Sequence, residues 1–322
     1  MSEDRAQGFR DAAEETAREQ RRIQEEIDRR DRERKEKQGG EDEQDGGVQA
    51  GEREQPENPM PDQHLEKPGV EAEMELRPRY AAPDYKGSEK LKDRVAIVTG
   101  GDSGIGRAVA VLFAREGADV AVVYLNEHQD AEETKRAVEE EGRRCILIPG
   151  DVRDPKFCDH SVERTLAEFG GVNVLVNNAA FQEHVGSLDE LSDEHLDMTM
   201  RTNIYGYIYM ARAALPHMKR GDSIVCCGSE TGLFGNKNLL DYSATKGAIH
   251  AFAMSLAQNV AERGIRVNVV APGPVWTPLN PADQPPDQIE SFGESTDMKR
   301  PAQPEEIAPA FVCLASPVCS SY

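Results

Sequence analysis

The sequence is short of positive charge. It has 38 lysine and arginine residues against 59 aspartate and glutamate residues, which gives a formal net charge of −21 over 322 residues. Nucleic-acid binding depends largely on basic side chains that contact phosphates, so this balance argues against a nucleic-acid partner. It argues equally against an anionic membrane surface. The acidic excess is interpreted as a contribution to solubility.

The sequence also lacks long apolar stretches. The first forty residues contain no apolar run that ends in a small-residue cleavage site, so no export signal is predicted. No stretch reaches the roughly 20 apolar residues that a membrane-spanning helix needs. We therefore expect a cytoplasmic protein with no membrane partner.

Cysteine and histidine residues are few and scattered. The six cysteines include no CxxC pair, and the seven histidines show no spacing typical of a metal site. The cysteines are interpreted as reduced thiols, and the adjacent Cys226 and Cys227 as core residues because they end an apolar strand pattern. No metal site is predicted.

The first 90 residues differ in composition from the rest. Residues 1–55 have almost no apolar side chains, so we expect them to be disordered or to form a solvated single helix near Glu14 to Lys37, without a packed fold. Only Ile23 and Ile27 could form a seam, which argues against a coiled coil. The proline-rich residues 56–90 predict an extended arm that lies on the domain or on a sister subunit, or else is a flexible linker.

Residues 91–322 alternate between short apolar runs and helical spacing. The runs predict strands near 95–98, 119–124, 145–149, 173–177, 223–227 and 266–270. Continuous apolar strands separated by helices indicate a parallel sheet that is covered on both faces. The predicted fold class is α/β, with a Rossmann-type doubly wound sheet.

A glycine-rich loop follows the first predicted strand. Gly100, Gly104 and Gly106 remove side chains where the backbone must turn, approach a pyrophosphate and pack a helix on a strand. The helix that follows presents its N-terminus to the phosphates. Thr99 and Ser103 are placed to add hydroxyl contacts. The loop therefore predicts a dinucleotide cofactor.

The end of the second strand should choose between NAD and NADP, because a carboxylate there binds the ribose 2′-hydroxyl and repels a 2′-phosphate. Tyr124 falls where that acid is expected, and Glu127 could serve if the turn is one step longer. The choice of cofactor therefore stays open. After the third strand, Asp151 is a candidate partner for the adenine amino group, or alternatively a turn or cap residue.

Tyr242 and Lys246 stand four residues apart, thirteen residues after Ser229. Positions i and i+4 share one face of a helix, so the Lys246 ammonium is expected to approach the Tyr242 phenol and lower its pKa. A free tyrosine titrates near pH ~10, and a lower pKa would suit general acid/base catalysis at neutral pH. The pair predicts hydride-transfer chemistry.

In order along the chain, these elements resemble the short-chain dehydrogenase/reductase family from about Gly87 onward. The resemblance rests on the TGxxxGxG loop at 99–106, Asp151, the NNAA element at 177–180, Asn203, Ser229, the YxxxK pair and Pro272-Gly273 followed by Thr277. Ala180 stands where the family usually has glycine. Within the family, the chain is similar to general stress oxidoreductases and to glucose and ribitol dehydrogenase homologues.

The resemblance implies a role for each matched residue. Tyr242 would be the acid/base, Lys246 would also bind the nicotinamide ribose, and Ser229 would hold the substrate oxygen. Asn203 would hold a water in a proton relay to Lys246. The residues expected to bind NAD or NADP are Thr99, Gly100, Ser103, Gly104, Ile105, Gly106, Tyr124, Asn126, Asp151, Val152, Asn178, Ala179, Tyr242, Lys246, Pro272, Gly273, Val275 and Thr277.

Substrate specificity is expected from loops beyond the carboxyl ends of the strands. Gln182, Glu183 and Glu230 suit a small polar aldehyde, sugar or polyol, and residues 274–298 are expected to form a mobile lid. By comparison with the family, a last strand is expected to be missing after residue 322. We expect a homo-oligomeric NAD(P)-dependent oxidoreductase or, alternatively, a cofactor-binding stress protein with little or no turnover.

Overall fold

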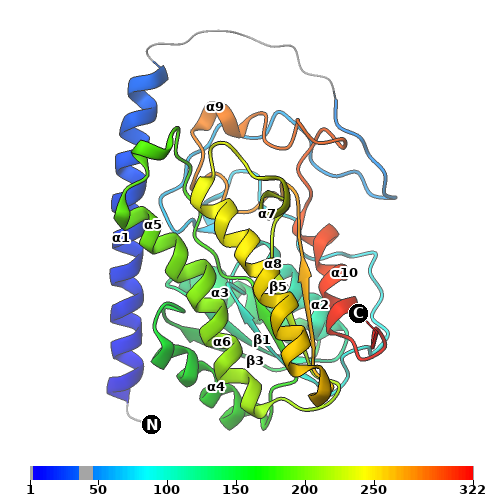
Figure 1. Cartoon of the computed structure of the whole chain (residues 1–322). Coiled ribbons are helices and arrows are strands. Elements are labelled where there is room, and N and C mark those ends of the chain that lie inside the picture. Colours follow the sequence, from blue (N-terminus) through cyan, green and yellow to red (C-terminus); the bar gives the residue numbers. More distant parts are fainter. Residues whose placement is uncertain (1–2, 36–45, 322) are drawn as a thin grey trace.

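The fold is built on a parallel sheet, as seen in a computed structural model that describes residues 3–35 and 46–321 (Figure 1). Within that range the sheet has six strands in the order β3-β2-β1-β4-β5-β6, and all neighbouring pairs are parallel. The strands are β1 Val95–Thr99, β2 Asp119–Tyr124, β3 Cys145–Pro149, β4 Val174–Asn177, β5 Ser223–Cys227 and β6 Arg266–Val270. The predicted doubly wound α/β fold is confirmed, and the strand order reverses between β1 and β4, where such folds bind ligands.

Helices cover both faces of the sheet. One apolar layer joins the sheet to α2 Gly104–Arg115, α3 His128–Glu140 and α10 Pro304–Ala315. The other joins it to α4 Pro155–Phe169, α6 Gly206–Ala214 and α8 Leu240–Val260. Because β1, β2, β4 and β5 are buried along their whole length, they can be apolar at every position, which is why their sequences do not alternate.

Shorter elements lie at the carboxyl ends of the strands. They are α5 Asp193–Met200, a π-helical turn at Arg201–Tyr205, α7 Thr231–Phe234 and α9 Pro286–Ile289. Single 3-10 turns occur at Glu71–Glu73, Leu188–Glu190, Leu215–His217 and Ala261–Arg263.

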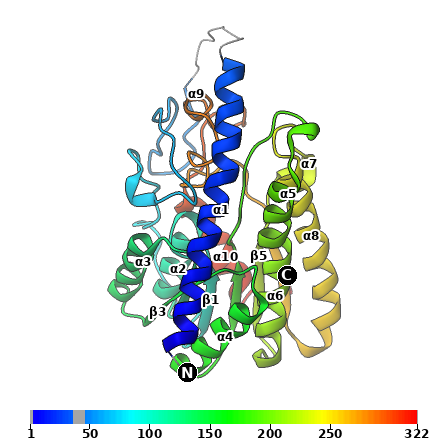
Figure 2. The ribbon, with the colours of Figure 1, turned by 90° about the vertical axis from the view of Figure 1, so that its left-hand side faces the viewer.

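The N-terminal helix α1, Glu3–Lys35, corrects one prediction. It begins well before Glu14, and it is not a solvated helix, because one side of it packs on the domain along the length of the molecule (Figures 1 and 2). The buried side consists of Ala13, Thr16, Ala17, Gln20, Ile23, Gln24 and Ile27, all at most 6% exposed. These positions recur at the spacing of one helix face. The predicted end of this helix, at Lys37, lies outside the described residues.

The proline-rich arm lies on its own domain. Its Met60, Leu65 and Met74 form a buried cluster with Trp276 and Ile289. Backbone bonds join the two segments, and the Trp276 indole N–H donates to the Leu76 carbonyl at 2.7 Å. Residues 274–298 were expected to form a mobile lid. The structure instead packs them against the arm, because the arm supplies the apolar surface that this segment lacks.

Candidate active site

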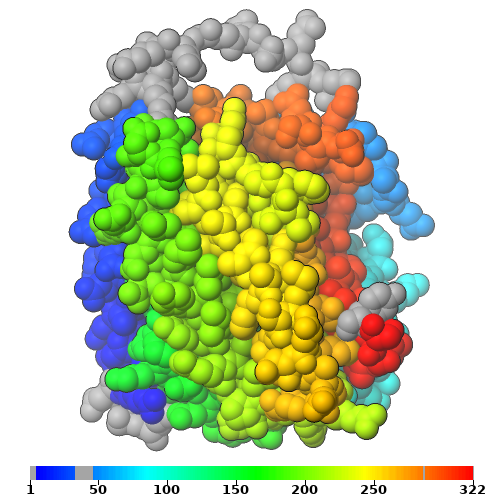
Figure 3. All heavy atoms as spheres, viewed as in Figure 1, coloured from blue at the N-terminus to red at the C-terminus, as the bar shows by residue number. Residues whose placement is uncertain are grey.

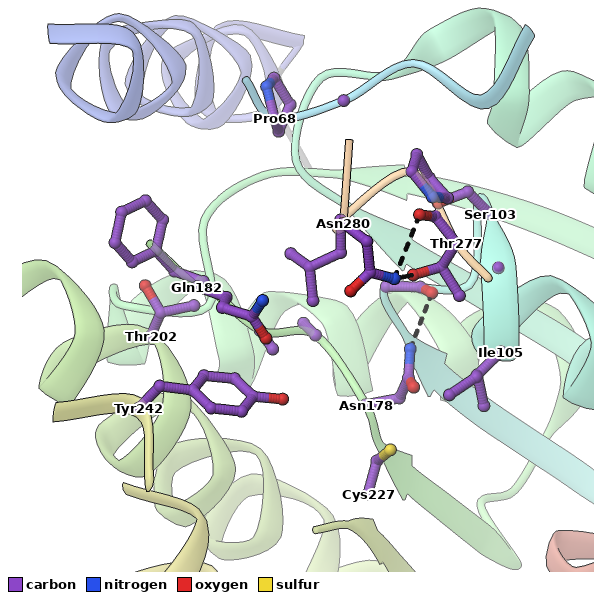
Figure 4. A pocket seen from close by; sticks show the side chains of 18 of the residues that line it. Pro68, Ser103, Ile105, Asn178, Gln182, Thr202, Cys227, Tyr242, Thr277 and Asn280 are labelled. Atoms are coloured by element: carbon purple, nitrogen blue, oxygen red, sulfur yellow. Dashed lines mark hydrogen bonds between the residues drawn. The ribbon is translucent and has the colours of Figure 1, made fainter. Parts of the chain in front are cut away.

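A cavity of about 290 Å³ opens at the carboxyl ends of the strands, beside the β1/β4 switch point. Figure 4 shows the Tyr242 hydroxyl pointing into it, with Gln182 nearby and Asn178 across the space. The predicted site residues that line the cavity are Gly100, Ser103, Gly104, Ile105, Tyr124, Asp151, Val152, Asn178, Ala179, Ser229, Tyr242, Lys246, Pro272, Gly273, Val275 and Thr277. Four others, Thr99, Gly106, Asn126 and Asn203, lie behind or beside that lining.

The glycine loop has the geometry that a bound dinucleotide needs. Gly100 and Gly104 have positive φ angles of 60° and 50°. A Cβ on Gly106 would lie 1.8 Å from the Gly100 carbonyl oxygen, so no side chain fits there. Gly106 therefore lets α2 pack closely on the loop, while Gly100 and Gly104 line the cavity without a side chain, as close approach of a pyrophosphate requires.

Thr99 acts on the strands, not on the cavity. Its hydroxyl accepts the N–H groups of Asn178 and Ala179 at 2.9 and 3.1 Å, and it donates to the Val176 carbonyl. The Asn178 amide in turn donates to the carbonyls of Thr99 and Gly100. These bonds fix the end of β4 against the glycine loop.

A carboxylate from the arm caps helix α2. Glu71 is fully buried, accepts the Gly104 N–H at 2.7 Å and pairs with the buried Arg107 at 2.5 Å. Asp130 accepts the N–H groups of Glu71 and Ala72. Burial raises the pKa of Glu71 to about 7 despite the Arg107 charge. The arm thereby fixes the start of the helix that follows the glycine loop.

Three side chains line the cavity near the end of β2. Tyr124 and Glu127, the two candidates for the ribose contact, both line it, together with the unpredicted Asp102. The Tyr124 hydroxyl lies 3.0 Å from His128 Nδ1. Burial, together with neighbouring carboxylates, raises the pKa of Glu127 to about 8 and that of Asp102 to about 6. Two acids therefore share this end of the cavity.

Asp151 has several partners. It accepts the backbone and Nε N–H groups of Arg153 at 2.8 and 2.9 Å, and the Thr16 hydroxyl of α1 at 2.5 Å. It thus acts as a turn residue and also faces the cavity, so both sequence interpretations apply. Asn126 faces away from the cavity, and its amide donates to Glu14 of α1 at 3.2 Å.

Tyr242, Lys246 and Ser229 meet at the floor of the cavity. Tyr242 and Lys246 lie on α8, and Ser229 follows β5. The Lys246 ammonium donates to the Cys227 carbonyl at 2.9 Å and lies 5.2 Å from the centre of the Tyr242 ring. The Ser229 hydroxyl accepts two bonds from Thr231.

The predicted lowering of the Tyr242 pKa is wrong for this structure. Burial raises the pKa of Tyr242, and a hydrogen bond with Ser229 offsets only part of that rise. Burial also lowers the pKa of Lys246. The reason is geometric: the ammonium lies over the ring and bonds a carbonyl, so it does not reach the phenol oxygen.

Asn203 lies in the π-helical turn Arg201–Tyr205 and is fully buried. Its side chain bonds the backbone N–H and carbonyl of Phe181 at 2.8 and 2.9 Å, and the Thr245 hydroxyl at 3.1 Å. Such turns are frequent at functional sites. Here the turn joins the loop after β4 to the helix that carries Tyr242.

A charged cluster stands beside the substrate end. Lys67 of the arm lies 3.0 Å from Glu183, and His184 lies 2.8 Å from Asp283 and 2.5 Å from Asp31 of α1. Glu183, His184 and Asp283 each offer a ligand atom within 4.8 Å of the others, a grouping that can hold a metal ion. The Lys67 ammonium already neutralises the charge of Glu183, so these side chains form an ion network.

The sequence did not predict several residues that line the cavity. They come from α1, the arm, the glycine loop and residues 274–298, and include Thr16, Gln20, Lys67, Pro68, Asp102 and Gln284. No apolar periodicity in the sequence marks these residues, because most of them are polar.

The fold and site together define an oxidoreductase that uses a nicotinamide dinucleotide. The glycine loop, the buried lysine and the position of the cavity at the carboxyl ends of the strands all fit that cofactor. The chain belongs to the short-chain dehydrogenase/reductase family. A family model described as Enoyl-(Acyl carrier protein) reductase matches residues 100–321.

Several curated relatives match over most of their length. General stress protein 39 of Bacillus subtilis is 50% identical over 250 residues, which is 78% of this chain and 87% of that protein. The chloroplastic NADPH-dependent aldehyde reductase 1 of Arabidopsis thaliana is 47% identical over 266 residues, with coverages of 81% and 92%. Glucose and ribitol dehydrogenase of Daucus carota is 44% identical over 268 residues, again with 81% and 92%.

Solved structures show the same fold with cofactor bound. A short-chain dehydrogenase from Burkholderia cenocepacia, in complex with NADP, aligns with a TM-score of 0.67 at 33% identity, over 72% of this chain and 94% of that one. A 3-ketoacyl-(acyl-carrier-protein) reductase from Brucella melitensis, complexed with NADH, aligns with a TM-score of 0.65 at 29% identity and the same coverages. The cofactor class, NAD(P), is thereby established. Among the described helices, none is long and apolar enough to cross a membrane.

Proposed function

We propose that this enzyme transfers a hydride between NAD(P) and the carbonyl or hydroxyl carbon of a small polar aldehyde, sugar or polyol. The observation that carries the proposal is that Gln182, Glu230 and Asn280 line the same cavity as Tyr242, so that amide and carboxyl groups stand among its apolar lining. Polar groups of this kind are suited to a hydroxylated substrate. The relatives named aldehyde reductase and glucose and ribitol dehydrogenase support the same substrate class.

In this proposal Tyr242 donates the proton to the substrate oxygen and Ser229 hydrogen-bonds that oxygen as charge develops on it. Burial raises the pKa of Tyr242, so the phenol is protonated at neutral pH, the form that reduction of a carbonyl needs. In the same proposal Lys246 binds the nicotinamide ribose, and Asn203 holds a water of a proton relay. The bound nicotinamide supplies or accepts the hydride.

The remaining contacts of the cofactor follow from the cavity lining. The loop Gly100 to Ile105 is proposed to hold the pyrophosphate, Asp151 and Val152 the adenine, and the stretch Pro272 to Thr277 the nicotinamide amide. Asn178 and Ala179 line the same cavity and complete the proposed contacts. The bond from the Glu230 N–H to the Pro272 carbonyl joins the nicotinamide end to the substrate loop.

The test is oxidation of NADH and NADPH with a panel of small aldehydes and sugars, and reduction of NAD and NADP with polyols. Replacing Tyr242→Phe should lower kcat by about 10²- to 10⁴-fold, because a positioned general acid contributes that much. Tyr205→Phe removes a hydroxyl from an exposed ring and should leave kcat unchanged. Cofactor binding without Tyr242-dependent turnover on any of these compounds would contradict the proposal.

Assembly and location stay predictions. Ile208, Leu215, Phe252 and Leu256 line a groove between α6 and α8, and the neighbouring Met254 is 61% exposed, which supports a homo-oligomer. The predicted cytoplasmic location rests on the sequence. The relative named general stress protein supports a role in stress.

A further inference from the structure

Helix α1 contributes side chains to the lining of the cavity. Two of its side chains, Thr16 and Gln20, line the cavity and are 3% and 6% exposed. Thr16 bonds Asp151, the residue proposed to bind adenine. Because the family match begins at residue 100, α1 lies outside the part of the chain that the family model describes.

The helix is held at several points along its length. Near its start, Phe9 packs edge-on against Phe157 of α4, with ring centres 5.4 Å apart. In its second half, the Gln24 amide donates to the carbonyls of Leu65 and Ala282, and its oxygen accepts the Lys67 N–H. Figure 3 shows α1 in close contact with the segments around α5 along one edge of the molecule. These contacts fix which side of α1 faces the cavity.

Charged contacts complete the attachment at the adenine end. Arg153, which holds Asp151, also bonds the Thr16 hydroxyl at 2.6 Å and Glu19 at 3.2 Å. Glu14 accepts the Asn126 amide. The loops after β2 and β3, which flank the adenosine in this fold, are therefore both bonded to α1.

We propose that α1 forms the outer wall of the adenosine subsite, with the Thr16 hydroxyl and the Gln20 amide as cofactor-binding groups. The Thr16 proton is donated to Asp151, so this hydroxyl can accept a bond from the adenine amino group or a ribose hydroxyl, and the Gln20 amide can both donate and accept. The wall encloses the adenosine half of the dinucleotide and slows its dissociation. This inference rests on the proposed orientation of the cofactor, with its adenine at Asp151.

The test compares one substitution on two sides of the helix. Ala17 is fully buried against the domain, and Ala12 is exposed on the same helix. Ala17→Lys should lift α1 from the cavity and raise the Kd for NADH on the order of tenfold, the loss expected for the hydrogen bonds of two side chains. Ala12→Lys should leave the Kd unchanged. Affinity is measured by titration calorimetry on the full chain.

A milder pair keeps the helix in place. Gln20→Ala should raise the Kd for NADH about threefold to tenfold, the usual effect of one lost hydrogen-bonding group. Gln7→Ala, on the exposed side, is its control. Reduced nicotinamide mononucleotide, which lacks the adenosine half, should bind all four variants like the unchanged chain. A Kd for NADH that is unchanged or lower in both Ala17→Lys and Gln20→Ala would overturn the inference.

The two proposals fail differently. If the unchanged chain binds NADH but turns over none of the substrates, the proposed function fails while the comparison of variants still decides the role of α1. If turnover depends on Tyr242 but neither α1 variant alters the Kd for NADH, only the adenosine wall is wrong. A loss of affinity for both NADH and the mononucleotide would also overturn it, because the effect would not belong to the adenosine end.

Discussion

At the scale of single residues, the glycine loop shows how little space the site leaves. The Gly100 carbonyl oxygen stands where a Cβ of Gly106 would have to be. No rotation of a side chain can relieve this contact, because the backbone alone sets the position of a Cβ and the carbonyl oxygen is itself a backbone atom. The constraint comes from packing helix against strand, one of the three tasks that the sequence assigned to these glycines.

Replacing Gly106→Ala should therefore destabilise the fold by at least about 1–3 kcal/mol, the usual effect of forcing extra volume into a packed site. NADH binding should fall with it. Gly171→Ala is the matched control, because a Cβ there would meet nothing within 4 Å. Urea unfolding of both variants measures the difference, and equal stabilities would contradict this account of the loop.

His184 predicts a pH dependence of stability. Burial lowers its pKa, but hydrogen bonds to Asp283, Asp31 and Glu183 outweigh burial and raise it from 6.5 to about 12. A group with a raised pKa in the folded state stabilises the protein fully below pH 6.5, and this contribution is lost as the pH rises towards 12.

The contribution of this group to the free energy of unfolding should therefore fall as the pH rises above 6.5, by up to about 1.4 kcal/mol per pH unit. The Tm should fall with it. In His184→Gln the fall should be shallower, although the Tm at pH 6 should be lower than in the unchanged protein. Thermal melts between pH 6 and 9 make the comparison. Parallel curves for the two proteins would show that His184 is not protonated in the network.

At the scale of elements, the arm and the segment 274–298 stabilise each other. Trp276 is the chain's single tryptophan, and it is 1% exposed at the centre of their shared cluster. Its fluorescence therefore reports on this cluster alone. The loop around Trp276 also carries Val275 and Thr277 to the cavity, so the packing of the arm positions the nicotinamide end of the site.

Met74→Ala should cost about 2–5 kcal/mol of stability in this cluster, as is usual when a buried methionine is truncated. The Trp276 emission should shift to longer wavelength, because water reaches the indole. Met254→Ala, at a methionine that is 61% exposed on α8, should change neither property. An unshifted emission in Met74→Ala would show that the arm does not protect Trp276.

The sequence predicted the elements whose pattern is set by local physics. Strands buried along their length read as apolar runs, and the glycine loop and the pair Tyr242 and Lys246 follow from backbone and helix geometry. Docking of α1 could not be predicted, because Thr16, Gln20 and Gln24 are polar and reveal a buried face only when their bonding partners are known. The direction of the Tyr242 pKa shift was missed for a similar reason, since the sequence gives neither burial nor the path of the Lys246 side chain.

At the scale of the whole molecule, distant segments of the chain meet around one cavity. The ion network joins four parts of the chain: α1, the arm, the loop after β4 and residues 274–298. Its members are Asp31, Lys67, Glu183, His184 and Asp283. The cofactor end and the substrate end are thus attached to the same N-terminal structure. A substitution that displaces α1 is therefore expected to change the affinity for the cofactor. The comparison of Ala17→Lys with Ala12→Lys tests this expectation.

The contacts of α1 also set an order of events during synthesis. Thr16 can bond Asp151 only after a further 135 residues have been synthesised, and Gln24 can bond Ala282 only after a further 258. At roughly 5–20 residues per second, the ribosome needs about 10 to 50 s to supply the later partner. The helix is therefore made first and docks last. Most of its side chains are charged, and its buried side combines small and amide side chains with only a few larger apolar ones, so the helix can stay in water until the rest of the protein has been made.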